Sequence, residues 1–224
     1  MSFARPLSRR MPAPERREQL LEITTRLVAE RGFHAISIEA VANRAGVTRA
    51  TVYLHFQDLR ELLTAVIERE TSRALAQVSE TTLTSLDEGN PQQLMLEALD
   101  AYLQAVRSQP TTWRLVLMPP EGAPAALHAK IAEGRAAVLE RLSRAVQPLT
   151  DRESRMRDAE LTAHVLSAIS DEYARLILTD PARFPPERLL AHARWWISDG
   201  PLVNEDRAPS PKLMPLNPGT PSKQ

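Results

Sequence analysis

Residues 37–56 read SIEAVANRAGVTRATVYLHF and contain the signals of two short helices. Ser37 and Thr48 each suit the cap of a helix N-terminus, because a hydroxyl oxygen can accept a hydrogen bond from a backbone N–H of the first turn. An apolar residue precedes each cap and another stands four residues after it, which is the pattern of a hydrophobic staple. Only residues 45–47 separate the two helices, so the helices must cross steeply. The stretch therefore predicts a helix-turn-helix.

The second of these helices carries side chains that suit the reading of DNA. In a helix-turn-helix the first helix braces the second, which lies in the major groove. The Arg49 guanidinium can donate two hydrogen bonds to a guanine edge, and the Thr51 methyl group can contact a thymine. Tyr53 and His55 can reach backbone phosphates, which position the protein without specifying sequence. The predicted DNA-contacting residues of this helix and the turn after it are Thr48, Arg49, Ala50, Thr51, Tyr53 and His55.

The alternative is a small helical bundle with a polar surface and no DNA contact. Tyr53 and Phe56 would then be core aromatics, and His55 would be a solvated histidine. For Phe56 we expect the core position in either case. For the others, the coincidence of caps, staples and the turn glycine Gly46 favours DNA reading.

The quoted stretch resembles the signature of TetR-family transcriptional regulators. The resemblance lies in Gly46-Val47, in Thr51 with Tyr53, in His55-Phe56, and in the preceding Arg31-Gly32-Phe33. It covers residues 17–68, about a quarter of the chain. The chain departs from the family at Leu59, where a lysine usually grips a phosphate. Either Arg60 takes over from a rotated position, or this contact is missing.

Composition limits the class of protein. The chain has 224 residues and no cysteine, which excludes a disulfide framework and a thiolate metal site. Seven glycines and a predominance of helix-forming residues argue against an all-β fold. No apolar run approaches the ~20 residues that span a membrane, and no apolar segment follows the N-terminal arginines as in a secretory signal. We expect a soluble, cytoplasmic, all-α protein without a cofactor.

Charge is unevenly distributed along the chain. The formal net charge is zero, yet residues 1–57 hold nine arginines against five glutamates, a net charge of +4. Such a split predicts that the N-terminal part meets a polyanion, although a chance excess on a solvated face is the alternative. Within residues 1–13, a flexible basic arm, Arg5, Arg9 and Arg10 could enter a minor groove. A disordered leader is the favoured reading of this arm.

The helical spacing of apolar residues, together with residues that start or end helices, divides the chain into domains. We expect a DNA-binding domain over residues 14–69 and an all-helical effector and dimerisation domain over residues 70–200, followed by a disordered Pro-rich tail over residues 201–224. The residues expected to begin helices are Pro14, Asp58 with Glu61, Asn90, Trp113, Pro124, Thr150 with Glu153, and the 184–187 segment. The residues expected to end helices are Gly32, Pro148 and Gly200.

The C-terminal part carries a predicted dimer interface. The resemblance implies that the last two helices of two subunits form a four-helix interface, and two apolar bands too wide for helices covered on one side support this. A dimer could read a palindromic operator. The candidate interface residues are Val165, Ile169, Tyr173, Leu190 and Trp196.

A small-molecule effector site is expected among the helices from Leu94 to Val146. The candidate lining residues are Tyr102, Trp113, Met118 and His128, each of which could instead be ordinary core. The segment from Met118 to Pro124 is the expected entrance. Because Arg107 is the only basic residue from Leu94 to Trp113, a multiply anionic effector is disfavoured.

Three functions are compatible with these patterns. The leading one is a repressor that a small-molecule effector releases from its operator. The second is a DNA-binding regulator that has no small-molecule ligand and is controlled by a protein partner. The third, an enzyme on a helical scaffold, finds no support in a Gly-rich phosphate loop, an H-E-x-x-H motif or a nucleophile motif. The five histidines at positions 34, 55, 128, 164 and 192 show no metal-ligand spacing, so no catalytic or metal residue is predicted.

Overall fold

The computed structural model describes residues 11–81, 90–152 and 158–198, and in these ranges it contains helices and no strand. The predicted all-α fold is thereby confirmed. The elements are α1 (Ala13–Arg31), the short 3-10 helix η1 (Phe33–Ala35), α2 (Ile38–Ala45), α3 (Arg49–Tyr53), α4 (Leu59–Thr81), α5 (Pro91–Ser108), α6 (Pro110–Leu117), α7 (Ala125–Arg152), α8 (Ala159–Thr179) and α9 (Pro186–Ser198). The predicted arm with Arg5, Arg9 and Arg10, and the predicted tail over 201–224, lie outside these residues.

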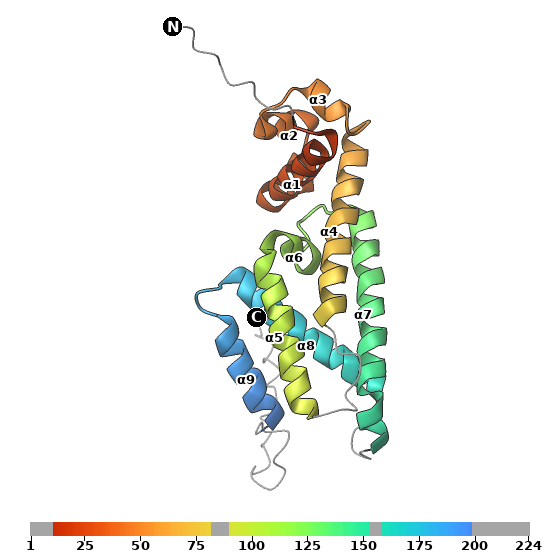
Figure 1. Cartoon of the computed structure of the whole chain (residues 1–224), viewed down its shortest axis with the longest axis vertical. Coiled ribbons are helices and arrows are strands. Elements are labelled where there is room, and N and C mark those ends of the chain that lie inside the picture. The colour runs from red at the N-terminus through yellow and green to blue at the C-terminus, as the bar shows by residue number, and fades with distance from the viewer. Residues whose placement is uncertain (1–10, 82–89, 153–157, 199–224) are drawn as a thin grey trace, which may run out of the picture.

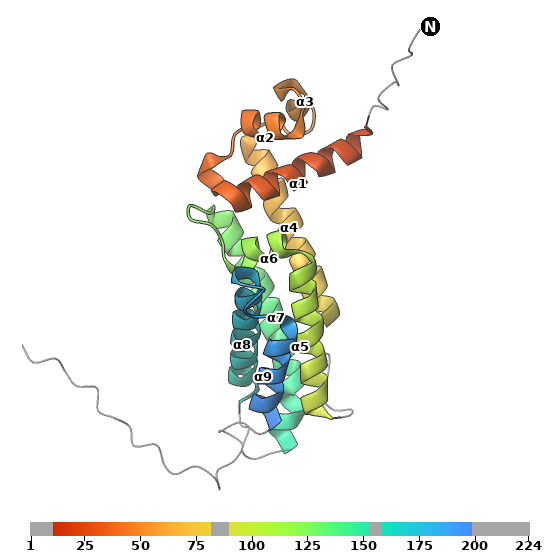
Figure 2. The ribbon, with the colours of Figure 1, turned by 90° about the vertical axis from the view of Figure 1, so that its left-hand side faces the viewer.

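The molecule is elongated, with a small helical head at one end of a larger helical body. Figure 1 shows α1, α2 and α3 in the head and the long helix α4 running from the head into the body. Figure 2, a quarter turn away, shows α1 crossing over α6, with α5, α7, α8 and α9 extending away from the head. No helix in the described ranges combines the length and apolarity needed to cross a membrane.

In the head, helix caps and a turn glycine define the helix ends at the positions that the sequence predicts. The Ser37 hydroxyl accepts a hydrogen bond from the Ala40 N–H at 3.1 Å, and the Thr48 hydroxyl accepts one from the Thr51 N–H at 3.2 Å. Gly46 ends α2 in the left-handed region at φ +65°, a conformation that costs glycine little because it has no Cβ. The head core contains the staple residues with Leu20, Val28, Phe56 and Leu62. Phe56 is 1% exposed, so it is a core aromatic as expected.

Helix α4 joins the two parts of the molecule. The Asp58 carboxylate accepts from the Glu61 N–H at 2.7 Å, and the Glu61 carboxylate accepts from the Gln57 N–H at 2.6 Å, so the predicted capping pair is present. From there α4 continues without a break to Thr81. The expected boundary between residues 69 and 70 falls inside this helix, and a rigid element therefore connects head and body.

Three helix boundaries differ from prediction. Helix α6 begins at Pro110 rather than Trp113, since proline is preorganised for a first helical turn. Helix α7 runs past Pro148 to Arg152, because a proline near a helix end removes one hydrogen bond without ending the helix. Thr150 consequently lies inside α7, and Glu153 lies outside the described residues. Asp158 caps α8 instead, accepting from the Leu161 N–H at 2.8 Å.

A buried carboxylate holds the head to the body. Glu70 on α4 is 1% exposed and accepts hydrogen bonds from Thr112 on α6, from Thr25 on α1 at 3.3 Å, and from the Arg69 Nε at 2.7 Å. The Arg69 side chain is 10% exposed and also pairs with Glu18 on α1 at 2.7 Å. Three helices therefore meet at one fully hydrogen-bonded charge, the condition under which a buried charge is tolerated.

Candidate nucleic-acid interface and effector cavity

The helix-turn-helix presents α3 at the outer end of the head (Figure 1). Thr48, Arg49 and Ala50 are exposed, Thr51 is half-buried, and Tyr53 is 49% exposed. Val52 is fully buried and fixes α3 on the head core. One face of α3 therefore anchors the helix, while the predicted DNA-contacting residues lie on its surface.

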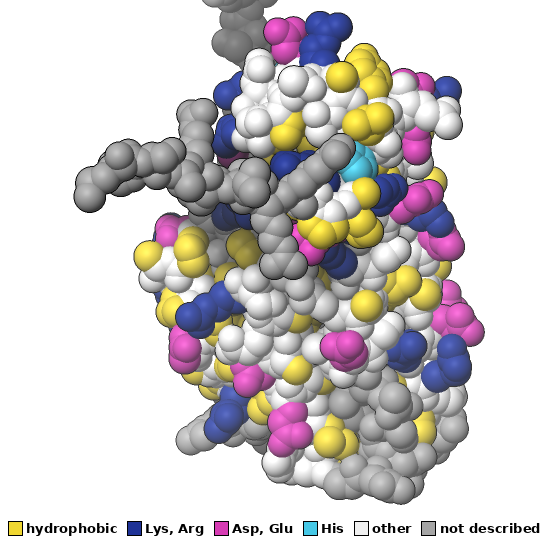
Figure 3. Space-filling model, turned by 45° about the horizontal axis from the view of Figure 1, so that its top comes forward, with side chains coloured by type: hydrophobic (Ala, Val, Ile, Leu, Met, Phe, Trp, Pro, Cys, Tyr) yellow, Lys and Arg dark blue, Asp and Glu magenta, His cyan; other side chains and the backbone are white. Residues whose placement is uncertain are grey.

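Basic groups near α3 differ in how far they are engaged. Arg44 pairs with Glu30 at 2.6 Å, and Arg26 pairs with Glu22 at 3.0 Å. Arg49 forms no ion pair within the described ranges, so its guanidinium keeps its donors for another molecule. Figure 3 looks obliquely onto this end of the molecule and shows basic side chains bordering uncharged ones.

The first turn of α4 contains the departure from the family pattern. Leu59 is half-buried and packs against the head core, so it contributes to stability rather than to a polar contact. The next residue, Arg60, is exposed, and His55 before the turn is half-buried. This arrangement leaves Arg60 as the basic side chain available for a phosphate at the start of α4.

Leu54 is a surface residue that the sequence prediction missed. It is 78% exposed at the C-terminal end of α3, beside Tyr53. An exposed aliphatic side chain on a recognition helix can contact a thymine methyl group. Its position between two predicted contact residues was a signal that could have drawn attention to it.

A cavity of about 370 Å³ lies in the body between α4, α5, α6, α7 and α8. Tyr102, Trp113 and His128 line it, so the structure brings three of the four predicted effector residues together. Met118 does not line it. This residue follows the end of α6 and lies at a separate hollow with Ala29 and Pro120, because the chain turns there toward α1.

Most of the cavity wall is apolar. Helix α4 contributes Ala74, Leu75 and Val78, and helices α5 to α8 contribute Met95, Ala98, Leu99, Val116, Leu117, Ile131, Val138, Leu142 and Leu166. Small-molecule sites in proteins have this character, with volumes of about 300–1,000 Å³ and a few polar groups that orient the ligand. The cavity is therefore large enough for a small organic molecule.

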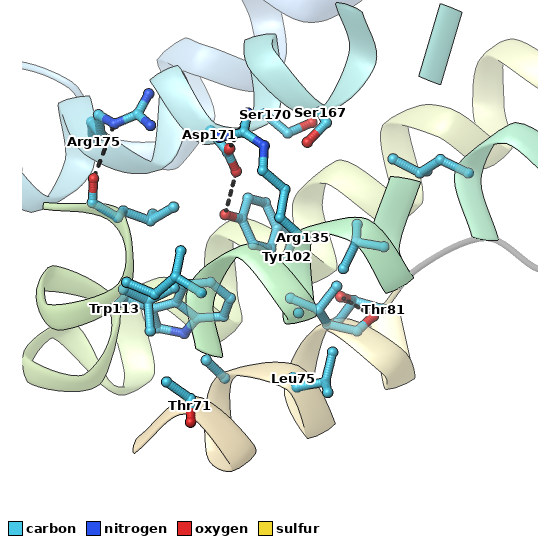
Figure 4. A pocket seen from close by; sticks show the side chains of 18 of the residues that line it. Thr71, Leu75, Thr81, Tyr102, Trp113, Arg135, Ser167, Ser170, Asp171 and Arg175 are labelled. Atoms are coloured by element: carbon cyan, nitrogen blue, oxygen red, sulfur yellow. Dashed lines mark hydrogen bonds and ion pairs between the residues drawn. The ribbon is translucent and has the colours of Figure 1, made fainter. Parts of the chain in front are cut away.

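The polar groups of the cavity gather around Asp171 on α8. The Tyr102 hydroxyl donates to the Asp171 carboxylate at 3.3 Å, and the Arg135 guanidinium pairs with it at 3.4 Å. Figure 4 shows Asp171, Ser170 and Ser167 on one side and Thr71, Leu75 and Thr81 on the other. Burial raises the pKa of Asp171 against the opposing effect of Arg135 and Arg175. Burial, and then the Asp171 charge, raise the pKa of Tyr102, which keeps this phenol a hydrogen-bond donor at neutral pH.

The sequence prediction missed this polar wall because its window ended at Val146, before α8. Ser167, Ser170 and Asp171 stand at positions i, i+3 and i+4, which places them on one face of a helix. Three polar residues on one face of a helix rich in apolar residues were the available signal. Within the described ranges, no three side chains of His, Cys, Asp or Glu lie close enough together to hold a metal ion.

Helices α8 and α9 leave an apolar face uncovered. Leu161 and Val165 on α8 are 61% and 46% exposed, and Trp195 on α9 is 48% exposed. Ile169 and Leu190 are half-buried against the core of their own chain, and Trp196 is half-buried. Tyr173 is 8% exposed in the single chain and its hydroxyl shares a 2.7 Å hydrogen bond with the His192 Nδ1, so it presents little surface to a partner.

Comparison with known proteins adds to this geometry. Residues 20–66 match the family described as bacterial regulatory proteins, tetR family. The HTH-type transcriptional activator FasR of Mycolicibacterium smegmatis is 31% identical over 107 residues, which are 48% of this chain and 48% of FasR. The chain thus spans about half the length of the curated relatives that it matches.

Solved structures share the fold. A TetR-like regulator from Rhodococcus sp. RHA1 superposes with a TM-score of 0.64 at 22% identity, over 83% of this chain and 95% of that one. AibR in complex with isovaleryl coenzyme A and operator DNA superposes with a TM-score of 0.61 at 19% identity, over 80% and 96% of the two chains. The relatives in sequence are transcriptional regulators rather than enzymes. Residues 20–66 thus carry a DNA-binding domain of the tetR family of bacterial regulatory proteins, and the chain as a whole shares its fold with TetR-like regulators.

Proposed function

We propose that this chain is a DNA-binding transcriptional regulator that binds a palindromic operator as a homodimer and leaves it when a small-molecule effector occupies the body. Residues 14–69 would form the DNA-binding domain, and residues 70–200 the effector and dimerisation domain. The observation that carries the proposal is the exposed surface of α3, held on the head core by the buried Val52. This role places the protein in the cytoplasm, where bacterial DNA lies.

Each predicted contact has a physical role in this proposal. Arg49 reads a guanine edge, and Thr51 contacts a thymine through its methyl group. Tyr53, His55, Thr48 and Arg60 hold phosphates and so fix the register of α3 in the groove. Ala50 is exposed between two of these residues, and its small side chain lets the backbone approach the bases.

The uncovered face of α8 and α9 supports the dimer. Exposed Leu161, Val165 and Trp195 form an apolar surface of the kind that symmetric dimers bury. A two-fold axis between these helices would place two copies of α3 so that they read two half-sites. The half-buried Ile169, Leu190 and Trp196 lie on the same two helices.

The cavity supports a small-molecule effector over control by a protein partner. A regulator without a ligand has no need of an apolar cavity of about 370 Å³ with a polar wall. AibR, which shares the fold, has been captured with a small molecule and operator DNA. In one conformation of the dimer the two α3 helices would be spaced wrongly for the operator. An effector that binds this conformation more tightly than the DNA-binding one, by a few kcal/mol, would release the operator.

Activation of transcription is a second candidate for the outcome of DNA binding. FasR, which is 31% identical over 107 residues, is named an activator. The same α3 contacts serve either outcome, since the position of the operator relative to the promoter decides whether polymerase is blocked or recruited. A reporter gene behind the selected operator distinguishes the two by the sign of its response to the regulator.

Arg49→Ala is expected to weaken binding to the operator by about 1–3 kcal/mol and to relax the preference at one base pair of each half-site. The reason is the loss of the two hydrogen bonds that the guanidinium donates to a guanine. The check is titration of operator duplexes, each with one base pair substituted, by fluorescence anisotropy.

Tyr53→Phe is the matched control for this experiment. It removes a hydroxyl assigned to a phosphate, so affinity should fall to a similar extent for every duplex, with the base preferences unchanged. If Arg49→Ala instead lowered affinity uniformly, or Tyr53→Phe altered the preference at one base, the two assignments would be wrong.

A further inference from the structure

The effector cavity holds one charge inside its wall. The side chain of Asp171 is 17% exposed, the least exposed of the charged side chains there. Lys130 and Arg175 also border the cavity, but their side chains are 49% and 36% exposed. Lys130 pairs with Glu133 at 2.9 Å and Arg175 with Glu172 at 3.4 Å, and neither acid lines the cavity. The Lys130 charge is therefore paired outside the cavity. Arg175 also donates through Nε to the Leu117 carbonyl at 3.3 Å and lowers the pKa of Asp171, but it forms no ion pair with Asp171 in the described ranges.

Asp171 is only loosely compensated by its own chain. The Arg135 guanidinium lies 3.4 Å away on a side chain that is 49% exposed, and the Tyr102 hydroxyl lies 3.3 Å away. Charge-assisted hydrogen bonds are normally shorter, at about 2.7–2.9 Å. A buried carboxylate gains from closer pairing, because the interior solvates it poorly. The site is thus poised to accept a better partner than Arg135.

The groups around Asp171 leave room for such a partner. The hydroxyls of Ser167 and Ser170 form no hydrogen bond within the described ranges, although Ser167 is 7% exposed. In the described ranges, every fully buried polar side-chain atom has a hydrogen-bond partner. Because the Ser167 hydroxyl has none, it must be accessible, and it opens onto the cavity that Ser167 lines. The rings of Tyr102 and Trp113 meet edge to face at 5.2 Å, and the Tyr102 hydroxyl lies 3.3 Å from the carboxylate. Hydroxyl acceptors and aromatic rings next to a carboxylate suit a cation.

The shape of the cavity indicates the length and polarity of the remainder of the ligand. On α4 its lining runs from Thr71 to Thr81, about 15 Å along a helix that rises 1.5 Å per residue. Between these ends the α4 wall is formed by Ala74, Leu75 and Val78. The cavity therefore suits an elongated apolar molecule whose one polar group reaches Asp171.

We propose that the effector is an elongated apolar amine, whose protonated nitrogen replaces the Arg135 guanidinium as the partner of Asp171 and donates to the hydroxyl oxygens of Ser167 and Ser170. The half-exposed Arg135 side chain can turn into solvent, where its charge is well hydrated. An apolar carboxylate would instead share Arg135 with Asp171 and place two like charges side by side. This inference rests on the proposed effector role of the cavity.

The test uses three probes with the same ten-carbon chain and different head groups: decylamine, decanoate and decanol. Isothermal titration of the full chain, with probes below their micelle concentrations, should show that decylamine binds most tightly. Asp171→Asn should reduce decylamine affinity by about tenfold to a hundredfold, the usual effect of losing one charge-assisted hydrogen bond. Glu140→Gln, which neutralises an exposed acid of α7 that pairs with Arg144 and does not line the cavity, should leave it unchanged.

Arg135→Gln is expected to affect the affinities of decylamine and decanoate in opposite directions. It removes the competitor for Asp171, so decylamine affinity should stay the same or rise. Tighter binding of decanoate, lost in Arg135→Gln, would overturn the proposal in favour of an anionic effector. Binding of none of the probes would overturn it as well. DNA binding by the same preparations without a probe is measured in parallel, so that a failure of the regulator role is seen separately.

Discussion

Replacing Leu161 and Val165 together with glutamate is expected to leave a folded monomer and to reduce operator affinity by about a hundredfold to ten-thousandfold. Both side chains are exposed on one face of α8, so the change leaves the core of the single chain intact. Two facing copies would bring four carboxylates together in an apolar interface, where like charges that lose their hydration are strongly unfavourable. Without the dimer each half-site is bound alone, and the gain from linking two binding events is lost.

Light scattering gives the mass of this variant, and anisotropy gives its affinity for the operator. The matched control is Ala132→Glu with Ala136→Glu, which adds the same charge at the same spacing on the exposed face of α7. The control should remain a dimer with full affinity. If the α8 variant also remained a dimer, the interface would lie elsewhere on the molecule.

Replacing Arg69 with methionine is expected to lower the free energy of unfolding by about 3 kcal/mol, because it leaves Glu70 buried without its closest cation. Glu70 is 1% exposed and keeps Thr25, Thr112 and a 3.5 Å contact with Arg73, which compensate only part of its charge. For a chain of this length, the melting temperature should fall by about 10 °C. Thermal unfolding followed by circular dichroism measures the change.

Arg73→Met is the control for the junction between head and body. Arg73 contacts the same acids, but its side chain is 38% exposed against 10% for Arg69, so water can replace most of what it provides. Its loss should cost about 1 kcal/mol or less. Equal effects of the two substitutions would mean that burial of the Glu70 charge does not control the stability of this junction.

The sequence predicted the head well because the head is specified by short-range chemistry. Ser37, Thr48 and Asp58 cap helices by contacts with backbone groups three residues away, and Gly32 and Gly46 end helices by their own conformation. Such signals lie within one turn of the residue that they govern. They can be recognised in a single sequence without knowledge of the tertiary fold.

The body was less predictable because its site is assembled from distant residues. Asp171 meets Tyr102 across 69 positions in the chain, and Glu70 meets Thr112 across 42. The apolar pattern of α8 showed that the helix needs much cover, but it could not show that Tyr173 faces its own core. Nor could it show that Trp195 is more exposed than its neighbour Trp196. Which side of a wide apolar band faces a partner depends on the crossing of whole helices.

Selection of bound duplexes from a random-sequence library by the full chain, followed by measurement of the stoichiometry, tests the DNA-reading dimer most directly. The expected product is an inverted repeat that binds two chains, with the preference at one base pair of each half-site lost in Arg49→Ala. Enrichment of no common sequence, or of a single half-site bound by one chain, would contradict the assignment of α3 as the reading helix of a dimer.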